Sequence, residues 1–328
     1  MTKSARISYV IMAILLVLIA WLHIGTLMLT VLFGHFALHL FSFGRSKLLG
    51  VSLYVVAVAA IGFGLVYFSS QAYHTLPEIA DKTIPAVVNF AEKQGMELPF
   101  TDYASLKTLA LKEANQGITD LGHYARTATL QFAMLLIGLV VALSLFLNAK
   151  WEMENDPDAV KDSLYSAVVG ELILRFRTFY GSFARVMGAQ IIISIINTAL
   201  TAGFLTWNGY PYTTVIIVLT FLCGLLPIIG NLLSNTLIIG VGFTISPRMA
   251  LFALIFLVVI HKLEYFLNSK IIGHRIKNPM WLTLIGLVLG EKLMGIPGMI
   301  LAPVVLHYIK VEASRSKVSE SVSPPPTA

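Results

Sequence analysis

The sequence predicts an all-α, polytopic membrane protein with about eight membrane segments, some of them broken or re-entrant in its C-terminal half. Hydrophobic residues make up 57% of the 328 residues and charged residues only 12%, against about 25% charged in soluble domains. The mean hydropathy is +0.81. Several apolar runs also reach the roughly 20 residues that a helix needs to cross the hydrocarbon core. These observations place the chain among integral membrane proteins.

Residues 1–70 are expected to hold three transmembrane helices. The apolar stretch from Ile7 to about Phe43 is too long for a signal peptide, whose apolar region has about 7–15 residues. We therefore expect two adjacent helices that turn near residues 23–25, followed by a third span from about Leu48 to Ser69. Basic residues flank the first and third spans and favour cytoplasmic ends under the positive-inside rule. They are Lys3, Arg6, Arg45 and Lys47.

Residues 71–129 form the long hydrophilic segment of the chain, which the count of crossings places outside the cytoplasm. Apolar residues recur in it at helical spacing, and Gly95 and Pro99 divide it into two halves. We expect a helical hairpin that rests on the membrane surface. The segment contains no nucleotide-binding or nucleophile motif, so we expect no enzymatic activity.

The C-terminal half, residues 130–310, contains the remaining apolar segments. The expected elements are a fourth span at about 130–148, an interfacial helix near 156–180, a fifth span at about 186–204, an apolar run at 213–245, a seventh block at 249–267 and a last block at 280–307. Residues 311–328 include Pro324, Pro325 and Pro326 and are expected to form a disordered cytoplasmic tail.

Two of these apolar segments contain residues that interrupt helices. They are Pro227 and Gly230 in the run 213–245, and Gly295, Gly298 and Pro303 in the block 280–307. Each segment can be either a pair of spans or a re-entrant hairpin, and the sequence leaves both alternatives open. Backbone groups freed at such breaks must face protein or water rather than lipid. Broken helices of this kind are typical of transporters.

His261, Glu264 and Asn268 are the strongest candidates for a transport site. They fall at positions i, i+3 and i+7 and therefore share one face of a helix. In the functional interpretation Glu264 carries a proton or cation and His261 tunes it. The alternative is a helix end at the membrane interface, with Glu264 held by hydrogen bonds and the neighbouring lysine reaching toward the headgroups.

Other polar residues in the apolar half are also candidates for the pathway. The adjacent Glu291 and Lys292 line a water-filled cavity or lie at an exposed turn. Asn197 forms a polar stripe with Ser194 and Thr201, and Asn231 and Asn235 flank Ser234 in a second stripe. Such stripes can line a path for a small polar solute, but hydrogen bonding between helices is an equally common use of these residues.

The sequence predicts no metal site and no cofactor. His35 and His39 are four residues apart but have no third ligand nearby, and Cys223 is the single cysteine. Without a Walker motif, the energy for transport must come from ion gradients or a partner. The net charge of +6 lies on short loops and tails, where it indicates topology rather than nucleic-acid binding.

Nearly the whole chain resembles the AI-2E family of bacterial membrane proteins, the autoinducer-2 exporter family. The motifs that carry the resemblance are Leu226-Pro227-Ile228-Ile229-Gly230, the helix end at Glu264 leading to Ile271-Ile272-Gly273, Asn278-Pro279, and the run from Gly295 to Pro303. Many relatives have a proline shortly after the glutamate helix, where this chain has Asn268-Ser269. The resemblance implies a multi-pass transporter of the bacterial inner membrane that forms homo-oligomers.

Three functions are compatible with these features. The first is export of a small polar solute such as autoinducer-2 by alternating access. The second is sodium(lithium)/proton antiport, which embedded carboxylates favour, whereas a wide polar cavity without buried carboxylates favours solute movement. The third is a non-transporting membrane scaffold, which requires a sealed apolar C-terminal half. The expected partners are a small polar solute or a monovalent cation and proton, together with membrane lipids.

Overall fold

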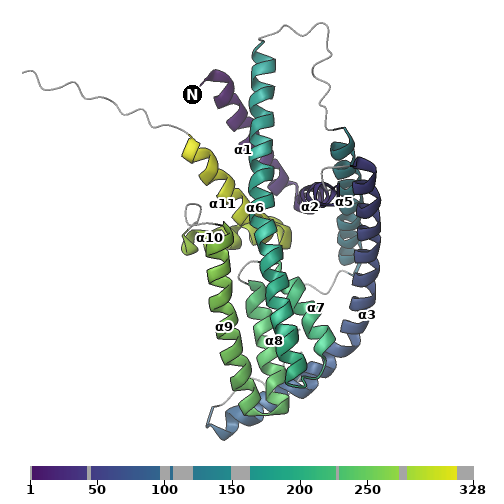
Figure 1. Cartoon of the computed structure of the whole chain (residues 1–328), viewed down its shortest axis with the longest axis vertical. Helices are drawn as coiled ribbons and strands as arrows, with labels where there is room; N and C mark the ends of the chain where they lie inside the picture. Colours follow the sequence, from purple (N-terminus) through teal and green to yellow (C-terminus); the bar gives the residue numbers. More distant parts are fainter. Residues whose placement is uncertain are drawn as a thin grey trace, which may run out of the picture. The chain divides into compact units, whose positions relative to one another are not determined.

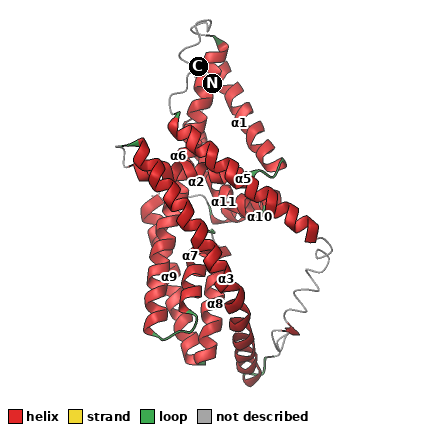
Figure 2. Cartoon of the chain, turned by 90° about the vertical axis from the view of Figure 1, so that its right-hand side faces the viewer, coloured by secondary structure: helices red, strands yellow, loops and turns green. Residues whose placement is uncertain are grey.

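The computed structural model of the chain describes residues 2–42, 46–96, 104–105, 121–148, 163–226, 229–272 and 279–315. Within these ranges the regular structure is entirely helical, as Figure 2 shows by colour. The chain forms two compact units, each assembled from separate stretches. Unit 1 comprises Met1–Gly25, Trp151–Val186 and Arg275–Ala328, and unit 2 comprises Thr26–Lys150 and Met187–His274.

The predicted turn near residues 23–25 is confirmed. Helix α1 spans Lys3–Trp21 and helix α2 spans Gly25–Ser42. His23 between them has a φ of 53°, a left-handed conformation that ends the first helix. The hydroxyl of Thr2 accepts a hydrogen bond from the Ala5 amide at 3.2 Å and so caps the start of α1.

Helix α3 is longer than the third predicted span. It runs from Lys47 to Lys93 and therefore continues from the apolar span into the hydrophilic segment, with Pro77 and Pro85 inside it. Its hydrophilic part is tied to the rest of unit 2 where Lys82 donates hydrogen bonds to Glu78 and to the Tyr212 hydroxyl, both at 2.8 Å. The second half of the expected surface hairpin lies mostly outside the described residues.

Helices α2, α3 and α5, the last spanning Leu121–Leu147, share a small apolar cluster in unit 2. Its buried members are Leu38, Tyr54, Ala142 and Phe146. Helix α6 spans Leu164–Trp207 without interruption, so the end of the expected interfacial helix and the fifth span form one helix. The helix start expected at Asp156-Pro157 lies outside the described residues. An aromatic turn follows α6, and Tyr212 in it has a φ of 59°.

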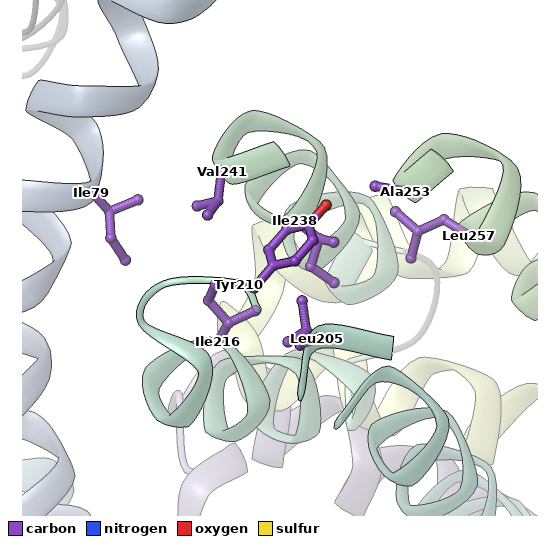
Figure 3. Close-up of a cluster of buried hydrophobic side chains, with 8 residues drawn as sticks. All are labelled: Ile79, Leu205, Tyr210, Ile216, Ile238, Val241, Ala253 and Leu257. Carbon is purple, nitrogen blue, oxygen red and sulfur yellow. The ribbon is translucent and has the colours of Figure 1, made fainter. Parts of the chain in front are cut away.

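The next three helices complete unit 2: α7 spans Thr213–Gly224, α8 spans Ile229–Ile245 and α9 spans Pro247–Ile272. Helix α8 packs against both α7 and α9, and α3 packs against α7 and α8 (Figure 1). Figure 3 shows the apolar cluster that joins these elements to the end of α6. Its buried members are Ile79, Leu205, Tyr210, Ile216, Ile238, Val241, Ala253 and Leu257.

The last apolar block is a helical hairpin in unit 1. Helix α10 spans Met280–Met294, helix α11 spans Ile296–Arg315, and the two pack along each other. Gly295 separates them with a φ of 64°, which suits a glycine. The backbones of Gly290 and Gly298 approach so closely that a Cβ on either residue would overlap the carbonyl of the other. The glycines of this block therefore permit both the turn and the contact between its arms.

Pro303 does not interrupt the chain where the sequence analysis expects a break. It lies inside α11, which continues to Arg315. The C-terminal part of α11 buries one face, with Val304, His307, Tyr308 and Glu312 almost inaccessible to solvent. A buried face holds a helix together through a proline, which removes one backbone hydrogen bond.

Six described helices are long and apolar enough to cross a membrane: α1, α2, α3, α5, α6 and α11. The shorter α7 and α8 are also apolar. Together these helices confirm the predicted polytopic all-α fold. With 12 residues, α7 is about 18 Å long, well short of the roughly 30 Å of a hydrocarbon core. A helix of this length does not cross the hydrocarbon core by itself, and its terminal carbonyls need partners from the protein wherever water is absent.

We predict that Gly298→Ala destabilises the folded protein by about 1–3 kcal/mol, because the new methyl group has to displace the Gly290 backbone. Gly62→Ala is the matched control, since nothing lies within 4 Å of a Cβ added at Gly62 in α3. The measurement is the thermal unfolding of both variants in detergent, followed by size-exclusion chromatography. Equal stability of the two variants would contradict the backbone contact.

Candidate functional site

Helices α8 and α9 each present one polar face toward the same place in unit 2. On α9 the face consists of Leu257, Ile260, His261 and Glu264, at positions i, i+3, i+4 and i+7. On α8 the residues at the same spacing are Asn231, Ser234, Asn235 and Ile238. Their apolar members, Leu257 and Ile238, belong to the cluster in Figure 3. The polar members therefore lie on the same helix faces as residues of this packed apolar cluster, and the packing of the cluster fixes their positions.

These faces border a small polar hollow to which α6 and α7 also contribute. The hollow has a volume of about 10 Å³, roughly enough for one water molecule. Its lining residues are Asn197 and Thr201 from α6, Thr220 from α7, Asn231, Ser234 and Asn235 from α8, and Leu257, Ile260, His261 and Glu264 from α9. Four helices thus converge on one polar point within an apolar unit.

Glu264 lies at the centre of the hydrogen bonds in this hollow. Its Oε2 atom accepts a short bond from the Asn231 side-chain amide at 2.6 Å and a longer one from the Asn197 amide at 3.5 Å. The residue is partly buried. Amide donors stabilise a carboxylate without cancelling its charge, whereas an ion pair would. Among the described residues no cationic side chain forms an ion pair with Glu264, and the donors observed at its carboxylate are neutral amides.

The Asn197 side chain leaves one acceptor open at the same place. Its Nδ2 faces Glu264, while its Oδ1 is buried and has no hydrogen-bond partner among the described residues. Buried acceptors are normally paired. The lining of this hollow thus includes a carboxylate and an amide oxygen without a partner among the described residues, which suits a ligand that brings donors or positive charge, such as a hydroxyl group, water or a hard monovalent cation.

The C-terminal end of α7 is held by side chains from α6. Gln190 donates to the Gly224 carbonyl at 2.6 Å, and the Ser194 hydroxyl donates to the Phe221 carbonyl at 2.9 Å. These bonds satisfy backbone acceptors that a helix end leaves without a partner. The approach is close, since a Cβ added at Gly224 would overlap the Ser194 hydroxyl, and one added at Gly230 would overlap the Cys223 carbonyl. The end of α7 is therefore fixed beside the hollow.

The structure brings together seven of the residues that were predicted from the sequence as pathway candidates: Asn197, Thr201, Asn231, Ser234, Asn235, His261 and Glu264. Asn268 follows one turn later in α9, but its side chain does not belong to the part of the structure that is described. Pro227, between α7 and α8, also lies outside it, and Gly230 lies at the start of α8.

Glu291 and Lys292 do not line this hollow. They belong to α10 in unit 1, where both side chains are exposed and their charged atoms lie 3.6 Å apart. Of the two alternatives for this pair, the exposed one fits. Among the described residues there is also no cluster of three or more His, Cys, Asp or Glu side chains that could hold a metal ion.

Gln190 and Thr220 are not among the residues predicted from the sequence. A signal for Gln190 is present, because positions 190, 194, 197 and 201 continue one face of α6. Its role as a cap is not visible in the sequence, because the bonded carbonyl lies 34 residues later. Thr220 gives no signal, since its hydroxyl bonds to the Ile216 carbonyl of its own helix, as threonines in apolar helices commonly do.

Residues 4–314 match the sequence profile of a family described as "AI-2E family transporter". Two relatives from Bacillus subtilis (strain 168) are similar to parts of the chain. "Putative transport protein YdbI" is 24% identical over 196 residues, which cover 59% of this chain and 56% of YdbI. "Putative transport protein YueF" is 33% identical over 138 residues, which cover 41% of this chain and 37% of YueF. The chain thus aligns with little more than half of YdbI and with little more than a third of YueF.

We predict that Asn231→Ala lowers the stability of the folded protein by about 1–3 kcal/mol, because it removes the shortest hydrogen bond to a partly buried carboxylate. Asn235→Ala is the control, since Asn235 lines the same hollow and no bond from it to Glu264 is observed. Thermal unfolding of both variants in the wild-type and Glu264→Ala backgrounds forms a double-mutant cycle, because alanine at position 264 leaves Asn231 no acceptor there. An Asn231→Ala penalty that is equal in both backgrounds would show that the bond does not matter.

Proposed function

Because the chain belongs to the AI-2E family of transporters, we propose that it is an ion-coupled secondary transporter in which Glu264 binds the coupling ion. The observation that carries this proposal is the partly buried Glu264 carboxylate, held by two neutral amides in a hollow for about one water molecule. A carboxylate in this setting binds a proton or a small cation reversibly. A wide cavity without a carboxylate would instead favour passive solute movement.

Sodium(lithium)/proton antiport is the reaction that this hollow fits best. Hard monovalent cations bind oxygen ligands, and the lining offers the carboxylate of Glu264, side-chain carbonyls of asparagines and hydroxyls of Thr201, Thr220 and Ser234. The volume suits an ion or a water molecule rather than an organic solute. Proton and cation would compete for the same Glu264 carboxylate, which is the simplest basis for exchange.

Export of a small polar solute such as autoinducer-2 is the second candidate. Amides, hydroxyls and a carboxylate match the hydrogen-bonding groups of a hydroxylated molecule. In this conformation the hollow is too small for such a molecule, so the proposal requires a wider state. The short α7 and the α7–α8 pair are discontinuous elements of the kind that rearrange during alternating access.

We also propose an orientation for the chain in the bacterial cytoplasmic membrane. Both termini are cytoplasmic and residues 71–129 lie outside the cytoplasm, because the basic residues around the first and third spans favour the inner side. The transporter works as a homo-oligomer, as the resemblance to the family implies.

The orientation predicts that a cysteine at position 93 reacts with a membrane-impermeant maleimide in intact cells. The variants are Lys93→Cys and, as a control on the opposite side, Ala313→Cys, both in a Cys223→Ser background. Both positions are exposed at helix ends. We expect Lys93→Cys to be labelled in intact cells and Ala313→Cys only after permeabilisation. The reverse pattern would rule out this orientation.

The coupling role predicts that Glu264→Gln abolishes pH-dependent transport while the protein still folds. A neutral amide keeps the size of the side chain and can still hydrogen-bond to Asn231, but it cannot bind a proton or balance a cation. The assay uses proteoliposomes with an internal pH indicator and imposed sodium, lithium or proton gradients. We expect cation-driven proton movement at the level of empty liposomes for Glu264→Gln.

Glu291→Gln is the matched control, because Glu291 is an exposed glutamate in unit 1. This variant is expected to transport like the unmodified protein. Movement of autoinducer-2 without cation exchange in the unmodified protein would favour the second candidate. Unchanged pH-dependent transport by Glu264→Gln would refute the coupling role of Glu264 in both candidate functions.

A further inference from the structure

Unit 1 contains a buried ion cluster between α6 and α11, in the part of the molecule that the proposed transport reaction does not use. Arg175 of α6 is only 6% exposed and Glu312 of α11 only 4%. The Arg175 guanidinium contacts Glu171 one turn earlier at 2.8 Å and Glu312 at 3.4 Å. Arg315 lies 3.9 Å from the other oxygen of Glu312 and donates to the Thr178 hydroxyl at 3.0 Å. Two acidic and two basic side chains therefore balance each other within the cluster.

Helix α1 is attached to this cluster through Tyr9. The Tyr9 hydroxyl donates a hydrogen bond to Glu312 at 2.8 Å. The Arg175 guanidinium lies over the Tyr9 ring, 4.2 Å from its centre, which is a cation–π contact. Tyr9 thus contacts both members of the buried pair, one through its hydroxyl and the other through its ring.

Apart from the Tyr9 contacts, helix α1 packs against α10. Only Ala5, Ser8 and Met12 are buried, one narrow and mostly small-residue face. The large apolar side chains on its other sides are exposed: Val10, Ile11, Ile14, Val17, Leu18 and Trp21. In a bilayer these side chains contact lipid wherever the helix lies, so apolar burial gives α1 little preference for one position. The polar contacts of Tyr9 are therefore its most specific attachment.

The cluster is also incompletely satisfied. Three of its buried atoms have no hydrogen-bond partner among the described residues: Arg175 Nε, Glu312 Oε1 and the hydroxyl of the adjacent Tyr308. Buried polar atoms without partners raise the free energy of the closed arrangement. Water that enters when the cluster opens would bond to them and recover part of that free energy. The cluster is thus built to open at lower cost than a fully bonded one.

We infer that this cluster is a lock that fastens α1 to α6 and α11 through Tyr9 and releases α1 when the Tyr9 contacts break. Residues 171, 175 and 312 form a preassembled docking site for the tyrosine. Helix α1 remains apolar on its outer faces after release and stays in the membrane, where it can take a second position. The lock does not rest on the assignment of Glu264.

The test measures the distance between spin labels on α1 and α11 in the purified full chain. Labels are attached at Val17→Cys and Ile309→Cys in a Cys223→Ser background, because both positions are exposed and neither belongs to the cluster. The unmodified cluster should give a single narrow distance. Tyr9→Phe, which keeps the ring but loses the hydroxyl, should add a second population at longer distance. Tyr9→Leu, which loses both contacts, should enlarge that population further.

Tyr165→Phe is the matched control, since it removes a hydroxyl from an exposed tyrosine of the same unit. It should leave the narrow distance unchanged. A single unchanged distance in Tyr9→Phe and Tyr9→Leu protein that elutes as one folded species would overturn the lock. If Tyr9→Leu does not fold, Tyr9→Phe decides alone, because loss of one hydroxyl leaves the packing of α1 in place.

Discussion

A backbone carbonyl inside a membrane must have a donor, and this constraint organises the polar residues of unit 2. Helix α7 ends after 12 residues, and its last carbonyls need donors from the protein wherever lipid rather than water surrounds them. Gln190 and Ser194 of α6 supply these donors, and their hydrogen bonds hold α6 against the C-terminal end of α7. The same face of α6 continues to Asn197 and Thr201 in the hollow. The polar hollow therefore lies beside the C-terminal end of α7, whose carbonyls require polar side chains nearby.

Both units contain a break in an apolar segment, and in both a glycine contact makes the break compact. In unit 2 Gly224 and Gly230 admit the Ser194 hydroxyl and the Cys223 carbonyl, and in unit 1 Gly290 and Gly298 bring two backbones together. Without a hydrophobic force between helices in lipid, such close backbone contact supplies much of the packing energy. The two breaks differ in their surroundings, since an exposed ion pair precedes Gly295 in unit 1, whereas the end of α7 in unit 2 lies next to Thr220 of the polar hollow.

Periodicity and turn residues were sufficient to predict most helices, the turn at His23 and the break at Gly295, because these depend on local chemistry. The polar spacing on α9 and α8 also singled out residues that line the hollow, although it did not predict that the two faces meet. Long-range contacts could not be predicted: the amide donors to Glu264 lie 33 and 67 residues away, and Thr178 lies 137 residues from Arg315. The continuation of α3 and α11 through prolines depends on what their faces bury, which composition does not reveal.

The contact between Gly290 and Gly298 also determines where this chain can vary as it evolves. The two backbones leave no room for a side chain at either position, so any amino-acid replacement there forces the two helices apart. Glu291 and Lys292, next to Gly290 but exposed, have no such restriction and can drift with little effect on the fold. Among diverging relatives, the inner face of this hairpin should therefore keep its residues while the adjacent outer face accumulates differences, so that rigid and freely changing positions alternate within a single helical turn.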